Sequence, residues 1–141
     1  MKGELDFAVD HLEWAIALKP EFAEAHNNLG STYLELNKND DAIKSYKRAL
    51  EFNPNYAIAS NNLGISYQRV GKVDLAIENF ENAIALSPGY ATAHHNLSGV
   101  KTYKPNDLQV IQMKSLLSSK KISKQDRIFL NLKMEIKLLC H

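Results

Sequence analysis

Two consecutive stretches of the chain share one pattern: AEAHNNLGSTYLELNKNDDAIKSYKRALEFNPNY at residues 23–56, and AIASNNLGISYQRVGKVDLAIENFENAIALSPGY at residues 57–90. They align without a gap at a spacing of 34 residues, so that Gly30 corresponds to Gly64. A fixed period of this length is typical of a solenoid, in which one small structural unit is stacked repeatedly. Partial copies on both sides extend the same register.

Each repeat predicts a pair of antiparallel helices. Leu29, Gly30 and Tyr33 fall on one face of a first helix, and the missing side chain of Gly30 lets a second helix approach closely. Asn37 tolerates the left-handed conformation that often ends a helix. Pro54 pushes the residue before it out of the helical region, so the second helix should end there. Since each pair leaves one face unburied until the next pair stacks on it, we expect an all-α, right-handed solenoid of antiparallel helix pairs.

The register also predicts how the chain is divided. We expect the second helix of a repeat at 1–22, complete repeats at 23–56 and 57–90, a degenerate repeat at 91–122, and a C-terminal helix within 123–141.

Two features set the C-terminal part apart from the complete repeats. In the degenerate repeat, Val110 and Lys114 take the places of a small residue and an aromatic residue. Residues 123–126, Ser-Lys-Gln-Asp, resemble a capping box for a helix from about 124 to 139. An alternating apolar run over residues 128–138 also fits a strand, but the Leu, Met, Lys and Glu content favours a helix.

The repeat pattern resembles that of the tetratricopeptide repeat family. Both complete repeats hold the Leu-Gly, Tyr, Ala, aromatic and Pro positions of its signature, and the resemblance covers residues 1–104. It implies a protein–protein interaction module whose first helices line a concave groove that binds an extended peptide or a partner protein. The stretch from Lys101 to Arg127 is weakly similar to the segment that follows such arrays in bacterial sulfotransferase-type proteins.

Asparagine recurs at the sixth position of the repeat, at Asn28, Asn62 and Asn96. This row resembles the asparagine ladder of the O-linked N-acetylglucosamine transferase superhelix, whose amides hold a peptide backbone. A carboxamide offers both donors and an acceptor, which matches a peptide N–H and C=O. The alternative is that repeat duplication copied these amides without a use. The resemblance implies a peptide-binding set of Asn27, Asn28, Ser31, Asn61, Asn62, Ile65, Arg69, His95 and Asn96.

Position five argues against the other groove pattern of the family. The clamp that holds the acidic C-termini of chaperones needs lysine at this position. This chain has Asn27, Asn61 and His95 there. We therefore do not expect acidic C-termini as ligands.

The first predicted helix carries an additional aromatic stripe. Phe7, His11 and Trp14 are spaced i, i+4 and i+7, whereas Ala8 belongs to the ordinary core face. Burial against one neighbouring helix would leave an exposed apolar patch, which usually marks an interface. We expect homodimerisation through Phe7, Ala8, His11 and Trp14, unless sequence upstream covers this helix in a longer protein.

Catalytic and cofactor motifs are missing from the sequence, so we expect no enzyme activity, no cofactor and no metal. It has no glycine-rich phosphate loop, no His-Glu-x-x-His and no Cys-x-x-Cys. The adjacent His94 and His95 point about 100° apart on a helix, which suits one metal poorly. His94 is expected to pack in the core.

Composition limits the remaining partner classes. The net charge is +1 and the C-terminal lysines are dispersed among apolar residues, so we expect neither nucleic acid nor a membrane as partner. The acidic start of the chain does not resemble a signal peptide, and we expect a cytoplasmic location. The alternatives to an interaction module are a substrate-recruiting or spacer domain of a larger sulfotransferase or glycosyltransferase, and a self-assembling structural element.

Overall fold

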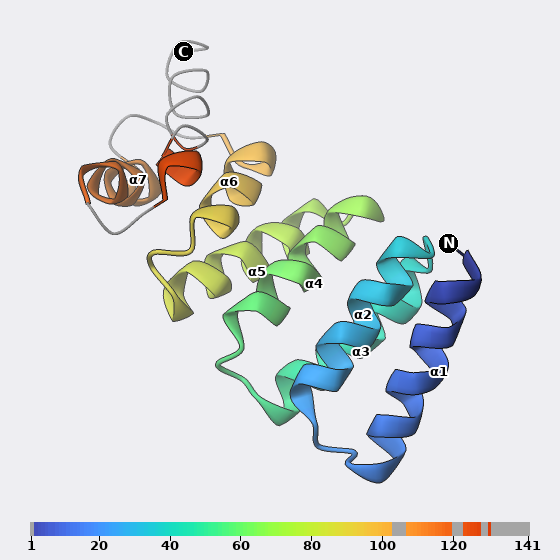
Figure 1. Cartoon of the computed structure of the whole chain (residues 1–141). Helices are drawn as coiled ribbons and strands as arrows, with labels where there is room; N and C mark the ends of the chain where they lie inside the picture. Colours follow the sequence, from blue (N-terminus) through green and yellow to red (C-terminus); the bar gives the residue numbers. More distant parts are fainter. Residues whose placement is uncertain (1, 103–106, 120–122, 128–129, 131–141) are drawn as a thin grey trace.

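The computed structural model describes residues 2–102, 107–119, 123–127 and 130. Its main helices are α1 (Lys2–Leu18), α2 (Ala23–Glu35), α3 (Asn39–Phe52), α4 (Ala57–Arg69), α5 (Val73–Leu86), α6 (Ala91–Val100) and α7 (Leu108–Ser118). Helices that follow each other in the chain lie side by side and antiparallel from α1 to α5, and the stack continues through α6 (Figure 1). No strand occurs in the described ranges. The expected all-α solenoid is therefore confirmed.

The turns inside the two complete repeats share one backbone geometry. Asn37 has φ 59° and Gly71 has φ 79°, both in the left-handed region. In the first turn the Lys38 N–H donates to the Tyr33 carbonyl at 2.8 Å, and the equivalent bond in the second turn is 2.9 Å. This 6→1 bond is the hallmark of the Schellman motif, which satisfies carbonyl groups left over at a helix end. The expected helix ends at Asn37 and Gly71 are thus confirmed.

The two helices of each repeat meet at a glycine. A Cβ atom placed on Gly30 would lie 2.7 Å from the Tyr46 ring, and one on Gly64 would lie 2.6 Å from the Phe80 ring. Both rings are almost completely buried. The predicted close approach at these glycines is confirmed, and the group that comes close is an aromatic ring of the second helix.

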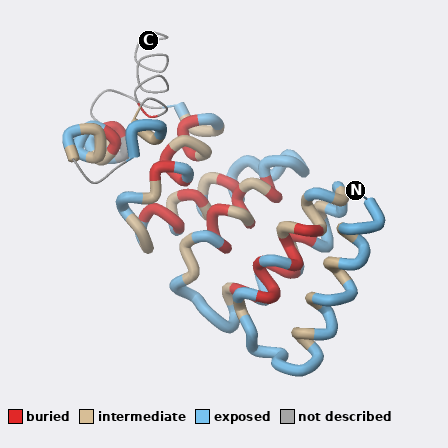
Figure 2. The backbone as a smooth tube through the Cα atoms, viewed as in Figure 1, coloured by how far each residue is buried: buried red, intermediate tan, exposed pale blue. Residues whose placement is uncertain are grey.

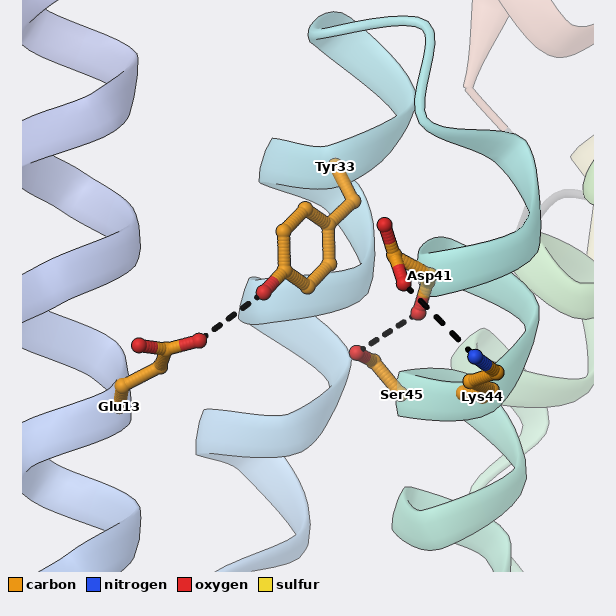
Figure 3. Close-up of polar contacts among 5 residues, drawn as sticks. All are labelled: Glu13, Tyr33, Asp41, Lys44 and Ser45. Carbon is orange, nitrogen blue, oxygen red and sulfur yellow. Dashed lines mark hydrogen bonds and ion pairs between the residues drawn. The ribbon is translucent and has the colours of Figure 1, made fainter.

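Burial increases from the N-terminal helix towards the middle of the solenoid. Buried residues line the contacting faces of α2 to α6, whereas α1 has no buried residue (Figure 2). A polar bond helps to hold α1 on α2, because the Tyr33 hydroxyl donates to Glu13 Oε1 at 3.0 Å (Figure 3). Partial burial, reinforced by the Glu13 carboxylate, raises the pKa of Tyr33 to about 12. Helix α1 is therefore held along one side only.

The degenerate repeat keeps an apolar inner face on its second helix, α7. Val110 and Met113 are buried, while Lys114, at the aromatic position, is exposed. The core aromatic of the complete repeats thus has no counterpart at position 114.

Residues 124–127 form the start of a further helix. Ser123 caps it, since its Oγ accepts the Asp126 N–H at 3.0 Å and donates to Asp126 Oδ2 at 2.8 Å. Arg127 donates to the carbonyl oxygens of Leu117 and Ser119 at the end of α7. The predicted capping residues are confirmed, while most of the expected helix at 124–139, and the strand considered as its alternative, lie outside the described residues.

Candidate functional site

The sixth-position asparagines are linked to fifth-position asparagines of the preceding repeat. Asn62 Nδ2 donates to Asn27 Oδ1 at 3.2 Å, and Asn96 Nδ2 donates to Asn61 Oδ1 at 2.9 Å. These bonds join α4 to α2 and α6 to α4. We call the surface of α2, α4 and α6 that carries Asn28, Asn62 and Asn96 the ladder face.

The two members of each pair differ in exposure. Asn27 and Asn61 are buried, whereas Asn62 and Asn96 are half-buried and Asn28 is exposed. The inner amides therefore orient the outer ones, and the outer ones face the surface. Asn28 differs from its two equivalents because it belongs to the first complete repeat and has no Asn–Asn bond to α1.

Asn61 is satisfied on both sides of its amide. It accepts from Asn96 and also hydrogen-bonds the Tyr90 hydroxyl. Burial raises the pKa of Tyr90, and the bond from Asn61 opposes part of that increase. The Asn61 side chain is thus part of the packing between repeats, with little capacity left for a ligand.

The other predicted site residues also have neighbours within the protein. Ser31 lies 3.0 Å from the Tyr46 hydroxyl, and Ile65 occupies the equivalent half-buried position in the next repeat. Arg69 is exposed, and its guanidinium donates to the Leu34 carbonyl at 3.2 Å. This cation therefore caps the end of α2. A ligand would have to share it.

His95 lies at the C-terminal end of the ladder face. It is half-buried and, with Thr92, Gln125 and Asp126, lines a pocket of about 220 Å³. The polar residues of 123–126 had been singled out in the sequence only as a helix cap. Their approach to α6 brings together side chains about 30 residues apart, and no local motif marks such a contact.

The aromatic stripe on α1 is exposed as expected from its spacing. Phe7 and Trp14 have 67% and 63% of their surface accessible, and the His11 ring lies 5.5 Å from Phe7 and 6.2 Å from Trp14. Leu18, one turn further, is 67% exposed and extends the stripe. Ala8 is half-buried and lies beside the stripe. The spacing i+11 from Phe7 was the available sequence signal for Leu18.

His94 is a core residue, as predicted. It is 1% exposed, and its Nε2–H donates to the Pro88 carbonyl at 2.9 Å. Burial lowers the pKa of its imidazole, although the bond to Pro88 opposes this effect. Within the described ranges, no group of three or more His, Cys, Asp or Glu side chains could hold a metal ion. In the same ranges, no helix is long and apolar enough to cross a membrane.

Comparisons with solved structures find proteins of the same architecture. The chain is similar to the crystal structure of MamA at 26% identity, with a TM-score of 0.67, over 94% of this chain and 68% of that chain. It is also similar, at 27% identity and TM-score 0.68, to the second TPR domain of human RPAP3, solved by NMR in complex with the HSP70 peptide SGPTIEEVD. This match covers 72% of this chain and 84% of that chain.

A third structure shares the fold at lower identity. The Thermobaculum terrenum O-GlcNAc transferase mutant K341M is 23% identical, with a TM-score of 0.70, over 83% of this chain and 23% of that chain. A search of curated proteins finds no match. None of these structures bears on the resemblance of the C-terminal stretch to sulfotransferase-type proteins, which stays a prediction.

Family models match the repeats themselves. A model described as TPR repeat matches residues 2–37 and 30–71, and a model described as Tetratricopeptide repeat matches residues 57–90. Together they span α1 to α5, which contain both glycine–aromatic contacts and both left-handed turns. The chain belongs to the tetratricopeptide repeat family.

Proposed function

We propose that this protein is an interaction module that binds an extended peptide along the ladder face, in the concave groove of its solenoid. Family membership and the peptide-bound RPAP3 domain support an interaction module. The observation that carries the peptide-binding part is the fixed orientation of the outer amides. Each of Asn62 and Asn96 donates one N–H to the amide behind it.

Fixing that N–H leaves defined hydrogen-bonding capacity on the surface. An asparagine amide has two donors and an oxygen with two lone pairs. Within the described part of the chain, the Oδ1 atoms of Asn62 and Asn96 accept no hydrogen bond. One N–H and the oxygen of each amide therefore remain for a peptide backbone. A pre-oriented amide loses less side-chain entropy on binding than a mobile one, which favours affinity.

The ligand is expected to differ in chemistry from the acidic peptide in the RPAP3 complex. In the present chain, position five holds two buried amides and a histidine, and Arg69 already caps α2. Contacts from amides to a backbone tolerate many ligand sequences. We therefore expect weak dependence on ligand side chains along the middle of the groove.

A backbone-methylation scan tests this function. A binding decapeptide is selected from a random display library, and each of its backbone N–H groups is then methylated in turn. We expect methylation at alternate or regularly spaced positions to weaken binding by about fivefold or more, the effect of one hydrogen bond. Side-chain replacement by alanine at the same positions should change affinity less. Binding that depends on side chains and ignores every methylation would contradict the proposal.

A second proposed function is self-association through α1. Phe7, His11, Trp14 and Leu18 form a continuous exposed stripe, which is unusual in a monomeric protein surface. A second copy of α1 could cover it about a two-fold axis, since the stripe would then meet itself. Light scattering on size-exclusion fractions should give a dimer that becomes a monomer in the Phe7→Lys, Trp14→Lys double variant. A wild-type monomer at high micromolar concentration would contradict this function.

Three further expectations from the sequence remain proposals. They are the absence of enzyme activity, a cytoplasmic location, and the lack of nucleic-acid or membrane partners. A role as a recruiting domain of a larger enzyme is not favoured by the comparisons, since the similarity to the glycosyltransferase extends to the fold alone.

A further inference from the structure

The pocket at the end of the ladder face has a size suited to one side chain. Its volume of about 220 Å³ lies below the roughly 300–1,000 Å³ typical of sites for whole small molecules. Thr92 and His95 line it from α6, and Gln125 and Asp126 line it from the next helix start. His95 directly precedes Asn96, the last asparagine of the ladder.

The repeat register explains why a pocket forms at this point. The residue 34 positions beyond Asn96 is Leu130, which is fully buried and has no amide. The residue 34 positions beyond Thr92 is Asp126. The row of amides therefore stops at Asn96, and a carboxylate stands beside its end. A peptide that follows the ladder would bring its next side chain, or its terminus, to this pocket.

The lining residues are chemically suited to a cation. Asp126 supplies the one carboxylate, and neither lysine nor arginine is among the lining residues. One Asp126 oxygen already accepts from Ser123, but a carboxylate has about four lone-pair sites, so acceptor capacity remains. The neighbouring Arg127 guanidinium is bonded to carbonyl oxygens at the end of α7. Oxygens of Thr92 and Gln125 can accept further N–H groups.

We propose that this pocket binds a cationic nitrogen group of the peptide ligand: an ammonium or guanidinium, from a lysine or arginine side chain or from the ligand's amino terminus. The proposal rests on the proposed peptide-binding function and adds an end-specific selection to it. Sequence-tolerant contacts along Asn28, Asn62 and Asn96 would hold the backbone. Asp126 would then fix the register of the peptide in the groove.

Labelled nonapeptides of alternating alanine and serine test this directly by fluorescence anisotropy. One series carries a single lysine moved from the first to the ninth position, and matched series carry norleucine or glutamate there. We expect lysine near one end only to bind about fivefold tighter than norleucine, as for a partly exposed ion pair. Peptides with a free or an acetylated amino terminus, without lysine, separate the terminal amine from the side chain as the source of the cation.

Variants of the protein assign the effect to the pocket. Asp126→Asn keeps an acceptor for Ser123 and should abolish the preference for lysine, as should Thr92→Lys, which places an ammonium in the pocket without touching the helix cap. Asp10→Asn on exposed α1 removes the same charge elsewhere and should leave the preference unchanged. Equal binding of lysine and norleucine peptides at every position would overturn this proposal and leave the peptide-binding function standing. Failure of every peptide to bind would overturn both.

Discussion

The hydroxyl groups of Ser31 and Tyr46 lie 3.0 Å apart, and one repeat later the same two positions hold Ile65 and Phe80. The pair thus changes from polar to apolar at both positions together. Tyr46 is 1% exposed, so its hydroxyl needs a partner inside the protein, and burial accordingly raises the pKa of Tyr46. Phe80 is equally buried and needs no such partner. Position nine of the repeat therefore depends on the aromatic residue fifteen positions later.

Exchanging the first pair for the second should show this dependence as a coupling energy. Ser31→Ile leaves the Tyr46 hydroxyl buried without its partner and should lower the free energy of unfolding by about 1–3 kcal/mol. The double variant Ser31→Ile, Tyr46→Phe should be more stable than the Ser31→Ile single variant. Urea denaturation of wild type, both single variants and the double variant measures the coupling. Simple addition of the two single effects would show that the pair is independent.

The glycine–aromatic contact should make one glycine sensitive and leave another tolerant. Gly64→Ala would place a Cβ atom 2.6 Å from the Phe80 ring, so we expect a loss of about 1–3 kcal/mol from overpacking. Gly99 lies in α6 with no atom within 4 Å of an added Cβ. Gly99→Ala should therefore be neutral or stabilise by about 0.5 kcal/mol through helix propensity. Thermal melts compare the two, and a similar melting temperature for both variants would contradict the packing assigned here.

The ladder asparagines should separate into structural and surface residues. Asn96→Ala removes a hydrogen bond and leaves the buried Asn61 oxygen without its donor, which should cost about 1–3 kcal/mol of stability. Asn28→Ala changes an exposed side chain without an Asn–Asn bond and should cost less than about 0.5 kcal/mol.

This contrast makes Asn28→Ala the cleaner probe of ligand binding. It should weaken peptide binding at unchanged stability, whereas Asn96→Ala changes both. Chemical denaturation and peptide anisotropy on the same samples give the two numbers. Equal losses of stability for the two variants would mean that the inter-repeat amide bond contributes nothing.

The stability of the protein should depend on pH through His94. Its pKa is lowered in the folded state by burial, so below the ordinary value of about 6.5 the unfolded chain binds more protons than the folded one. The free energy of unfolding should therefore fall as pH decreases from about 7.5 to 5.5, by at most about 1.4 kcal/mol per pH unit for this one group.

His94→Gln retains a donor for the Pro88 carbonyl and does not titrate. Denaturant titrations at pH 7.5, 6.5 and 5.5 should show a smaller slope with pH for this variant than for wild type, whatever its absolute stability. Parallel slopes would mean that His94 is not the group responsible. The comparison of slopes separates His94 from the other four histidines, which both proteins share.

The sequence by itself determined the relationships within a repeat. The spacing of Gly30, Tyr46 and Asn37 recurs 34 residues later, and it predicted both helices, their turn and their closest contact. Such features depend on local dihedral preferences and on one face of a helix meeting its immediate neighbour. These forces act over short sequence distances, so they leave a visible period.

Only the tertiary structure decided how one repeat lies on the next. The spacing placed all the asparagines of the ladder in one peptide-binding set, but stacking buries Asn27 behind Asn62 and separates an orienting residue from a surface residue. Stacking likewise brings Asp126 to His95, where the amide row has ended. The rise and rotation between repeats set these neighbours. They arise from the sum of many contacts along the whole interface, and no single motif in the sequence encodes them.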